Sequence, residues 1–194
     1  MTAILKVDTI QDVDGNNIIN ENSNTITIGA SGDTISIPSG ATITNSGTAT
    51  GFGGGKVLQI VQGSTSTETR SSSNSLVDTT LTASITPSAS DSKVLVTVFQ
   101  NGCDKSAANA GNQMILKLLR GSSVITTFGN NVTYTNSAIS NSIGTTGTMY
   151  LDSPSTTSAT TYKTQMSNGN NTANVGTQGT GGELSTITLM EISA

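Results

Sequence analysis

Acidic side chains are the residues of this sequence that could take part in catalysis. Histidine is absent, so the chain cannot form a Ser-His-Asp or Cys-His arrangement, nor a zinc site of the Cys/His type. Paired carboxylates could still cleave a polysaccharide. The candidates within residues 56–194 are Asp78, Asp91, Asp104, Asp152, Glu183 and Glu191. Turn-forming neighbours flank Asp91 and Asp152, and aromatic platforms for a sugar are scarce, so we predict that the protein is not an enzyme.

Patterns for metals and phosphates are incomplete. Asp8, Asp12, Asp14 and Asn16 have a spacing suggestive of calcium, but the glycine falls at the wrong position and no Glu closes an EF-hand loop. The glycines before Lys56 lack the spacing and the following Ser or Thr of a phosphate loop. We therefore expect no cofactor and no bound metal.

Polar loops offer a different chemistry, which is the binding of sugars. Three segments rich in Asn, Ser, Thr and Gly read as loops, namely Asn101–Gln113, Gly129–Gly147 and Ser167–Gly182. Loops on a rigid scaffold commonly carry function. Amides and hydroxyls can hydrogen-bond sugar hydroxyls, a tyrosine can stack on a sugar face, and a lysine can meet an anionic glycan or lipopolysaccharide. We predict receptor contacts by Lys105, Asn130, Tyr134 and Asn170, with a solvated surface loop as the alternative for each.

The composition indicates strands joined by polar turns. Of the 194 residues only 10% are charged and 3% aromatic, and Thr, Ser, Asn and Gly take their place. Thr favours strands, whereas Asn and Gly favour turns. The net charge of −4 and the scattered cations argue against nucleic acid. No apolar run could span a membrane, and the N-terminus does not resemble a signal peptide. Cys103 is interpreted as a small residue near a strand end, not as a reactive thiol.

The first fifty residues contain two kinds of pattern. Residues 1–22 read as strand, turn and strand, with Asp14-Gly15 suited to a hairpin. Residues 23–50 contain three similar segments that begin at Thr25, Thr34 and Ala41, in which isoleucines alternate with Thr or Ser. Repeats of this kind indicate units that cannot bury their apolar faces alone.

The repeat predicts an assembly of several copies. Burying one isoleucine stabilises by about 1.5–3 kcal/mol, whereas ordering each residue's backbone costs about 1–2 kcal/mol. For a single copy, the free energy gained by burial is therefore smaller than the cost of ordering the backbone. Three copies around an axis would turn every isoleucine inward. We predict a trimeric β-shaft, in preference to a monomeric β-solenoid of three turns. Its core residues would be Ile26, Ile28, Ile35, Ile37 and Ile43.

A Gly-rich linker at residues 51–55 leads to a predicted β domain at residues 56–194. Eight strands with intervening turns predict a β-sandwich or jelly roll. Val94, Val96 and Val98 alternate with Leu95 and Thr97 as in a central strand. The predicted strands are Lys56–Gln62, Leu76–Ile85, Lys93–Gln100, Met114–Arg120, Val124–Thr127, Thr148–Leu151, Thr161–Gln165 and Ser185–Ile192.

Several segments resemble one family. Leu5–Ile10, Gly15–Asn20, Thr25–Ile35 and Ile37–Ile43 are similar to short tail fibres and fibre-like structural proteins of tailed bacteriophages, especially those of aquatic bacteria. Leu151–Tyr162 and Ile187–Ile192 resemble the heads of the same proteins. The resemblance implies a homotrimer, an N-terminal segment bound to other tail or baseplate proteins, a thin shaft and a C1q-like or TNF-like jelly-roll head. It also implies synthesis in the host cytoplasm and incorporation into the virion tail.

The leading hypothesis is therefore an all-β, homotrimeric tail fibre whose head recognises a glycan, lipopolysaccharide or protein of the host surface. We expect no nucleic-acid partner and no membrane insertion. Two alternatives remain, a capsid or collar decoration fibre without a receptor role, and a small polysaccharide depolymerase.

Overall fold

The structure is a computed structural model that describes residues 9–11, 13, 17–22, 25–29, 31–42, 44, 57–107, 110–170, 173–179 and 181–194. The chain divides into two compact units, residues 1–50 and 51–194. Every regular element in the described ranges is a β-strand, and all strand pairs are antiparallel, which confirms the all-β prediction. Over the same ranges the structure holds no helix with the length and apolarity needed to cross a membrane.

The N-terminal unit contains a three-stranded sheet. Strands β1 (Thr9–Gln11), β2 (Asn17–Asn22) and β3 (Thr25–Ile28) lie in that order. The two predicted strands are thus observed, whereas Asp14 and Gly15 of the predicted turn lie outside the described residues. In the register of the sheet, Ile19 lies opposite both Ile10 and Ile28, so one isoleucine from each strand forms a row.

The first of the three isoleucine repeats is a strand, and the second is not. Thr25–Ile28 is β3, which pairs with β2. The segment 34–38 forms no strand, and neither do the described residues of the third repeat. Ile43 lies outside the described part of the chain. A strand needs a neighbour for its backbone hydrogen bonds, and β2 provides one to the first repeat alone. The trimeric shaft stays a prediction.

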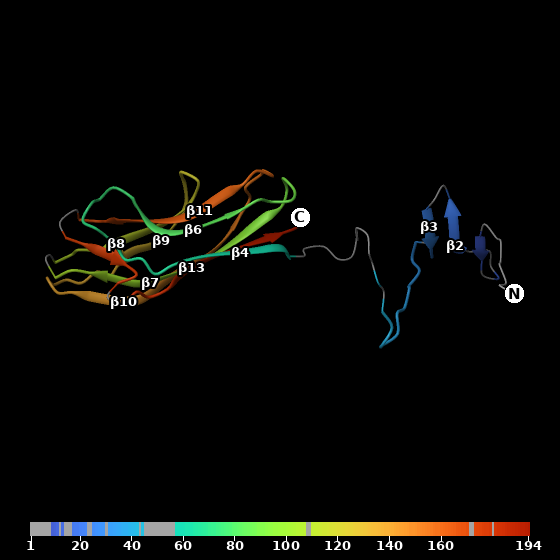
Figure 1. Cartoon of the computed structure of the whole chain (residues 1–194), viewed down its shortest axis with the longest axis horizontal. Coiled ribbons are helices and arrows are strands. Elements are labelled where there is room, and N and C mark those ends of the chain that lie inside the picture. Colours follow the sequence, from blue (N-terminus) through green and yellow to red (C-terminus); the bar gives the residue numbers. More distant parts are fainter. Residues whose placement is uncertain are drawn as a thin grey trace. The chain divides into compact units, whose positions relative to one another are not determined.

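The C-terminal unit, here called the head, consists of two facing sheets (Figure 1). The first sheet has β4 (Val57–Thr65), β13 (Ser185–Ile192), β7 (Lys93–Lys105) and β10 (Asn141–Asp152) side by side. The short strands β12 (Val175–Thr177) and β5 (Thr69–Ser71) continue this sheet along the far end of β7. The second sheet has β6 (Val77–Ile85), β11 (Thr160–Asn168), β8 (Met114–Arg120) and β9 (Ser123–Val132).

The chain crosses between the two sheets at nearly every connection. Among the eight long strands, β8 and β9 are the exception, since a hairpin at Gly121, with a φ of 59°, joins them. The short strands β5 and β12 also stay in the first sheet, next in the chain to β4 and β13. The resulting orders, β4-β13-β7-β10 and β6-β11-β8-β9, are those of an eight-stranded jelly roll. The predicted sandwich is therefore confirmed, while the finer likeness to C1q-type or TNF-type heads remains a prediction.

The core of the head lies between the two sheets. Alternate side chains of β7 and β13 point inward and are fully buried, namely Val94, Val96, Val98, Ile187 and Leu189. The intervening Leu95 and Thr97 are half-buried. This pattern confirms the prediction that β7 is a central strand, because β13 and β10 flank it on its two edges.

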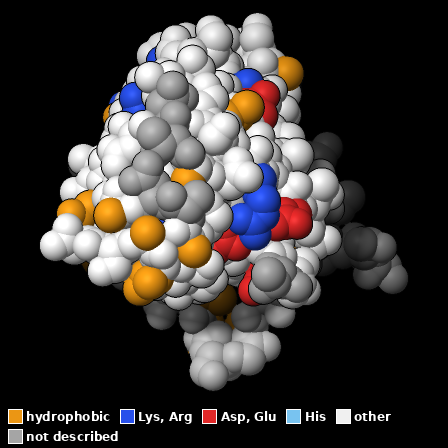
Figure 2. Space-filling view, turned by 90° about the vertical axis from the view of Figure 1, so that its left-hand side faces the viewer, with side chains coloured by type: hydrophobic (Ala, Val, Ile, Leu, Met, Phe, Trp, Pro, Cys, Tyr) orange, Lys and Arg blue, Asp and Glu red, His pale blue; other side chains and the backbone are white. Residues whose placement is uncertain are grey.

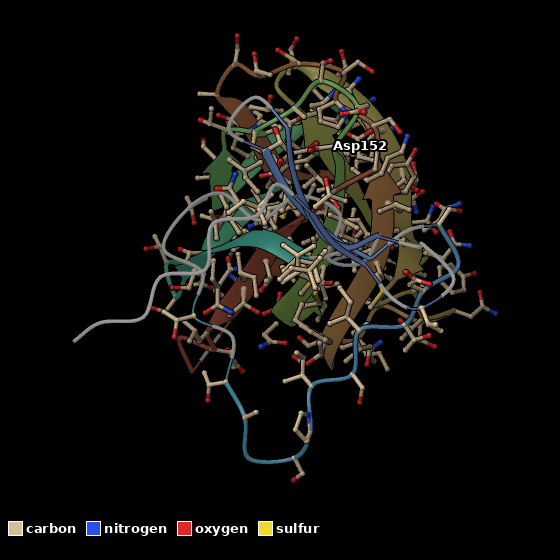
Figure 3. All side chains as sticks on the ribbon, turned by 90° about the vertical axis from the view of Figure 1, so that its right-hand side faces the viewer. Asp152 is labelled. Atoms are coloured by element: carbon tan, nitrogen blue, oxygen red, sulfur yellow. The ribbon has the colours of Figure 1, made fainter. Side chains whose placement is uncertain are left out.

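The registers define two ends of the head. Val57 and Lys93 both pair with Ile192 at the end where the chain enters, which we call the entry end. Asp152 pairs with Val94 and thus lies at the entry end as well (Figure 3). Thr65 and Lys105 mark the opposite end, which we call the loop end.

Candidate functional site

The connections at the loop end are shorter than the sequence indicated. Strand β7 continues to Lys105, β9 reaches Val132 and β10 begins at Asn141. Strand β12 takes up part of the third predicted loop. The predicted extents of the three loops were therefore wrong, because Asn and Gly residues typical of turns lie inside strands. Among the described residues of the three predicted loops, those outside strands are 106–107, 110–113, 133–140, 169–170, 173–174, 178–179 and 181–182.

Hydrogen bonds join the first and third of these loops. The Ser106 amide donates to the Asn174 carbonyl at 2.9 Å, and Asn112 Nδ2 donates to the same carbonyl at 3.2 Å. Asn168 Nδ2 donates to Asn112 Oδ1 at 2.5 Å and also to the Ala173 carbonyl. Asn112 and Asn168 are fully buried. Two buried amides thus hold the two loops in one arrangement.

The second loop is attached through Gly111. The Gly111 amide donates to the Thr135 carbonyl at 3.0 Å, and Asn170 Nδ2 donates to the Gly111 carbonyl. A Cβ placed on Gly111 would lie 3.0 Å from Asn170 Nδ2 and 3.8 Å from a Tyr134 ring carbon. Two predicted receptor residues, Tyr134 and Asn170, therefore lie next to the same glycine. Tyr134 is 48% exposed and Asn170 is exposed, so both can reach a ligand.

The turn that presents Tyr134 is held in an uncommon conformation. The Tyr134 amide donates to the Asn131 carbonyl at 3.1 Å. Asn131 and Thr133 have φ values of 62° and 65°, and such values are costly for a β-branched residue like Thr133. Asn141 Nδ2 donates to the Thr133 carbonyl at 3.0 Å, which fixes the turn against β10. A loop was predicted for this segment, but the positive φ values of Asn131 and Thr133 were not.

The prediction for Lys105 was wrong. This lysine is only 2% exposed and lies in β7, where its ammonium donates to the Ser137 carbonyl at 3.2 Å. A buried ammonium with such a partner cannot serve as a surface contact for an anionic glycan. Asn130 is exposed on β9 beside the turn, and no hydrogen bond in the described part of the chain joins it to Tyr134 or Asn170. Its role stays a prediction.

The surface of the loop end carries few charges. Figure 2 looks onto this end, where uncharged side chains and backbone dominate and one group of basic side chains adjoins acidic ones. At this end Arg70 donates to both oxygens of Asp104 at 2.7 and 2.6 Å, and also bonds Glu68. Such bidentate pairs are strong and directional. The charges of Arg70 and Asp104 are thus satisfied within the protein, and the loops present amides, hydroxyls, the Tyr134 phenol and exposed apolar side chains such as Ile139.

The candidate catalytic carboxylates are mostly engaged elsewhere. Asp104 pairs with Arg70, Asp78 with Lys163 at 2.9 Å, and Asp152 with Arg120 at 2.8 Å. Glu191 is buried and accepts bonds from Gln59 at 2.6 Å and Ser88 at 2.7 Å. The notion that this last-strand carboxylate would face a lysine or solvent is therefore wrong. Among the described residues, no three His, Cys, Asp or Glu side chains are grouped to hold a metal ion.

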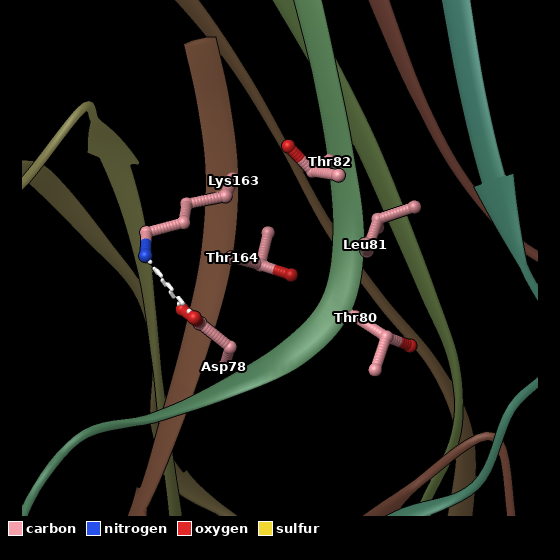
Figure 4. A pocket seen from close by; sticks show the side chains of 6 residues that line it. All are labelled: Asp78, Thr80, Leu81, Thr82, Lys163 and Thr164. Carbon is pink, nitrogen blue, oxygen red and sulfur yellow. Dashed lines mark hydrogen bonds and ion pairs between the residues drawn. The ribbon is translucent and has the colours of Figure 1, made fainter.

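A pocket of about 240 Å³ lies between β6 and β11 (Figure 4). The two strands separate there because β6 bulges at Thr80, which has a φ of 66°. The charged groups of the lining, Asp78 and Lys163, bond each other. The hydroxyl of Thr80 bonds Thr65, that of Thr82 bonds the Tyr162 carbonyl, and that of Thr164 bonds Gln100. Its polar groups are therefore already satisfied by the protein.

Cys103 is a structural residue. It lies fully buried in β7, and its thiol donates to the Gln100 carbonyl at 3.4 Å. Burial raises the pKa of Cys103 to about 11. Since the thiolate is the reactive form, the expectation of an unreactive cysteine agrees with the structure. Tyr162 belongs to the core, and the partly buried Tyr150 packs against it.

The isoleucines predicted for the shaft are exposed within their own chain. The exposed fractions are 69% for Ile26, 55% for Ile28, 59% for Ile35 and 48% for Ile37. Ile10 and Ile19, which share a row with Ile28, are 40% and 37% exposed. Isolated exposed apolar residues are ordinary on protein surfaces, but a run of isoleucines in one short unit is not. These side chains are available for contact with another molecule.

No protein-family model matches the sequence, and a search of curated proteins gave no significant match. Function must therefore be inferred from the geometry of the loop end and from the exposed apolar residues.

Proposed function

We propose that this protein is the subunit of a homotrimeric bacteriophage tail fibre whose head binds a glycan or lipopolysaccharide of the host surface. The observation that carries the proposal is the meeting of three loops at the loop end of the head. Buried amides join two of these loops, the Gly111 amide attaches the third, and Tyr134 and Asn170 are exposed next to Gly111. Rigid loops that present amides, hydroxyls and one aromatic ring suit a sugar.

The position of these loops supports a distal receptor site. The chain enters the head at Val57, which lies at the entry end, while the loops lie beyond Lys105 at the opposite end. A fibre that is anchored to the virion by its N-terminus would therefore present the loops outward, toward the host cell. The anchoring partner, in this proposal, is another protein of the tail or baseplate.

The exposed isoleucines support the homotrimer. Ile26, Ile28 and Ile35 are each more than half exposed. Burying each of them against neighbouring copies would stabilise the assembly by about 1.5–3 kcal/mol. A threefold arrangement gives each chain two neighbours, and each isoleucine row then faces the axis.

The carboxylates support a binding role over catalysis. Asp78, Asp104 and Asp152 each form an ion pair with a basic side chain. A glycosidase needs two carboxyl groups that face the same sugar, one of them able to give up a proton. We therefore assign the head to recognition and expect no hydrolysis of host polysaccharide.

Cell binding tests the proposal directly. Fluorescently labelled full-length protein is mixed with a panel of bacterial strains, with and without enzymatic removal of surface glycan, and bound fluorescence is measured. We expect binding to some strains, loss of that binding on glycan removal, and competition with phage infection. A matched variant, Tyr134→Ala, is expected to bind weakly while Ser84→Ala, on the side of the head, binds normally. Adhesion that survives glycan removal, or no adhesion to strains that the parent phage infects, would overturn the glycan-receptor role.

A further inference from the structure

The loops at the loop end contain no charged residue. None of residues 106–113, 133–140, 169–174 and 178–182 is an Asp, Glu, Lys or Arg. A ligand that contacts these loops therefore meets amides, hydroxyls, carbonyls and apolar groups. The charged side chains at the same end lie on the adjoining strands and connections, and they are Glu68, Arg70, Asp104, Lys105 and Glu183.

The basic side chains of this group are already engaged within the protein. Two nitrogens of Arg70 donate to Asp104 at 2.7 and 2.6 Å, and a third donates to Glu68 at 2.5 Å. Lys105 is only 2% exposed. Recognition of an anionic sugar relies on charge-assisted bonds from Arg or Lys. Here such a sugar would have to displace a carboxylate from Arg70, and the exposed Glu183 would repel it.

The loop of residues 133–140 is compact because one carbonyl gathers three donors. That carbonyl belongs to Ser137, and its donors are the Thr135 hydroxyl at 2.8 Å, the Ile139 amide at 2.9 Å and the Lys105 ammonium at 3.2 Å. The bond from Asn141 that fixes the turn also joins the base of this loop to β10. Side chains on the loop are thus presented in one arrangement, at little cost in conformational entropy when a ligand binds.

Exposed apolar side chains share this loop with the polar groups. Tyr134 is 48% exposed and Ile139 is 54% exposed. Ile143, near the start of β10, is 45% exposed. Figure 2 shows hydrophobic side chains gathered on one side of this end, apart from the group of basic and acidic side chains. The surface that the loop offers is therefore an aromatic ring with aliphatic groups, and not a charged patch.

Asn170 supplies a polar group beside the ring. Its Nδ2 donates to the Gly111 carbonyl, and its backbone amide donates to Asn168 Oδ1 at 2.8 Å. No donor in the described part of the chain bonds Asn170 Oδ1. The bond from Nδ2 orients the side chain, so Oδ1 can accept a hydrogen bond from a hydroxyl or an N–H of a ligand.

Sugars with apolar substituents match this combination of groups. The C–H face of a sugar ring stacks on an aromatic ring, and a hydroxyl or an acetamido N–H can donate to the amide oxygen. The methyl group of an acetamido or 6-deoxy sugar gains free energy when it is buried against an aliphatic side chain. A carboxylate or phosphate in the same position would lose hydration without gaining a cation.

We propose that the loop end binds neutral glycans whose sugars carry apolar substituents, such as acetamido and 6-deoxy sugars, and discriminates against uronic acids and phosphorylated sugars. Tyr134 stacks on a sugar ring, Asn170 accepts a bond from the same sugar, and Ile139 contacts its substituent. The inference rests on the proposed receptor function and names the class of sugar for that site. On a lipopolysaccharide, it selects a neutral polysaccharide chain over the phosphorylated part.

Discharging the natural glycan tests the charge requirement. The probe is surface polysaccharide from a strain to which the full-length protein adheres, used as isolated and after reduction of its carboxyl groups and removal of its phosphate. Biolayer interferometry gives the affinity of full-length protein for both preparations, at low and at high salt. We expect affinities that agree within about twofold in all four conditions. A decrease of about tenfold or more, on discharging or on adding salt that screens charges, overturns the proposal.

Substitutions at Ile139 test the apolar contact on the same polysaccharide. We expect Ile139→Ser to weaken binding by about tenfold and Ile139→Leu, which stays apolar, to retain it. Val124→Ser is the matched control, since Val124 is 45% exposed on β9 beside the Gly121 hairpin at the entry end. Thermal unfolding shows whether each variant folds, and Ile139→Thr replaces an Ile139→Ser variant that does not. An Ile139 variant of this kind with wild-type affinity overturns the apolar contact.

The receptor role itself is tested on untreated cells. Adhesion to no strain, or adhesion that survives enzymatic removal of the glycan, overturns the glycan-receptor role and this inference with it; the second outcome indicates a protein receptor. Binding to the untreated polysaccharide that is lost when the polysaccharide is discharged overturns the inference alone. The two failures are therefore distinguishable on the same protein preparation.

Discussion

The hydroxyl of Tyr162 donates a hydrogen bond of 2.6 Å to Asp152 Oδ2 at the entry end of the head. Arg120 donates to both oxygens of the same carboxylate at 3.1 and 2.8 Å. Asp152 lies at the end of β10 in the first sheet, while Arg120 and Tyr162 lie on β8 and β11 of the second. The three side chains therefore tie the two sheets together where the chain enters the head.

Removing the tyrosine hydroxyl should weaken this link between the sheets. Tyr162 is fully buried, and burial together with the Asp152 carboxylate raises the pKa of Tyr162 well above its ordinary value, so the hydroxyl remains a donor. Hydrogen bonds to charged groups contribute about 1.5–3 kcal/mol. We expect Tyr162→Phe to lower the free energy of unfolding by about 2 kcal/mol. Asp152→Ala should lower it by more, because it removes the acceptor of the Tyr162 hydroxyl and also the ion pair with Arg120.

Urea unfolding at one fixed protein concentration measures both effects. Ser84→Ala serves as the control, since it removes an exposed hydrogen bond to Thr161, and surface substitutions of this kind usually change stability by less than about 0.5 kcal/mol. A Tyr162→Phe variant as stable as the control would show that the hydroxyl contributes nothing to the link.

The strands of the core could be predicted because their side chains alternate. Ile187 and Leu189 in β13, and the valines of β7, place apolar residues on one face at the period of a strand. Strands β5 and β12 were missed because they are short and polar, and they form only by pairing with each other and with β7. Local sequence does not encode a pairing between Ser71 and Val175.

The candidate site was harder to predict than the fold, because it too depends on pairing between segments far apart in the chain. Lys105 follows Asn101 and Gly102, which are typical of a loop, but β10 and β12 pair with this part of β7 and keep it in the sheet. The loop that contains Ser137 then covers the lysine. The approach of Tyr134 and Asn170 to Gly111 depends on contacts between residues far apart in the chain. Amino-acid type identified the right loops, while only the fold shows which side chains meet.

The two sheets approach each other closely at Gly63. An added Cβ there would collide with the Thr82 carbonyl oxygen and lie 3.2 Å from the Ala83 Cβ. The neighbouring atoms are backbone and cannot rotate away, and overpacking of this kind costs about 1–3 kcal/mol. We expect Gly63→Ala to lower the melting temperature of the head by several degrees, while Ser64→Ala, which faces outward, leaves it nearly unchanged. Calorimetry on the two variants decides, and equal melting temperatures would contradict the close approach.

Tyr134, which is exposed at the loop end, should contribute to binding but not to stability. Tyr134→Ala removes the ring that can stack on a sugar, and its side chain is 48% exposed. We expect adhesion to host cells to fall by about tenfold or more, which corresponds to about 1.4 kcal/mol or more, with an unchanged melting temperature.

Asn168→Ala provides the contrast to that substitution. It removes the buried amide that joins Asn112 and Ala173, so adhesion and thermal stability should both decrease. A Tyr134→Ala variant that adheres like the wild type would remove Tyr134 from the receptor site, whatever Asn168→Ala does.

Glu191 makes the stability of the head depend on acid. Burial, the largest influence, disfavours its charge, but bonds from Gln59 and Ser88 outweigh it and lower the pKa of Glu191 from 4.5 to about 2. A carboxyl whose pKa is lower in the folded than in the unfolded protein stabilises the fold above its unfolded pKa. This contribution is therefore complete above pH 4.5 and is lost as the pH falls toward about 2.

Replacing this carboxylate should make the free energy of unfolding less dependent on pH under acidic conditions. Glu191→Gln keeps the shape of the side chain but cannot ionise, so its free energy of unfolding should change less than that of the wild-type protein between pH 4.5 and about 2. Urea unfolding at a series of pH values gives the two curves. Glu183→Gln removes the same charge at an exposed position at the loop end and should retain the wild-type slope. Parallel curves for Glu191→Gln and the wild type over this range would show that the bonds from Gln59 and Ser88 do not favour the ionised form.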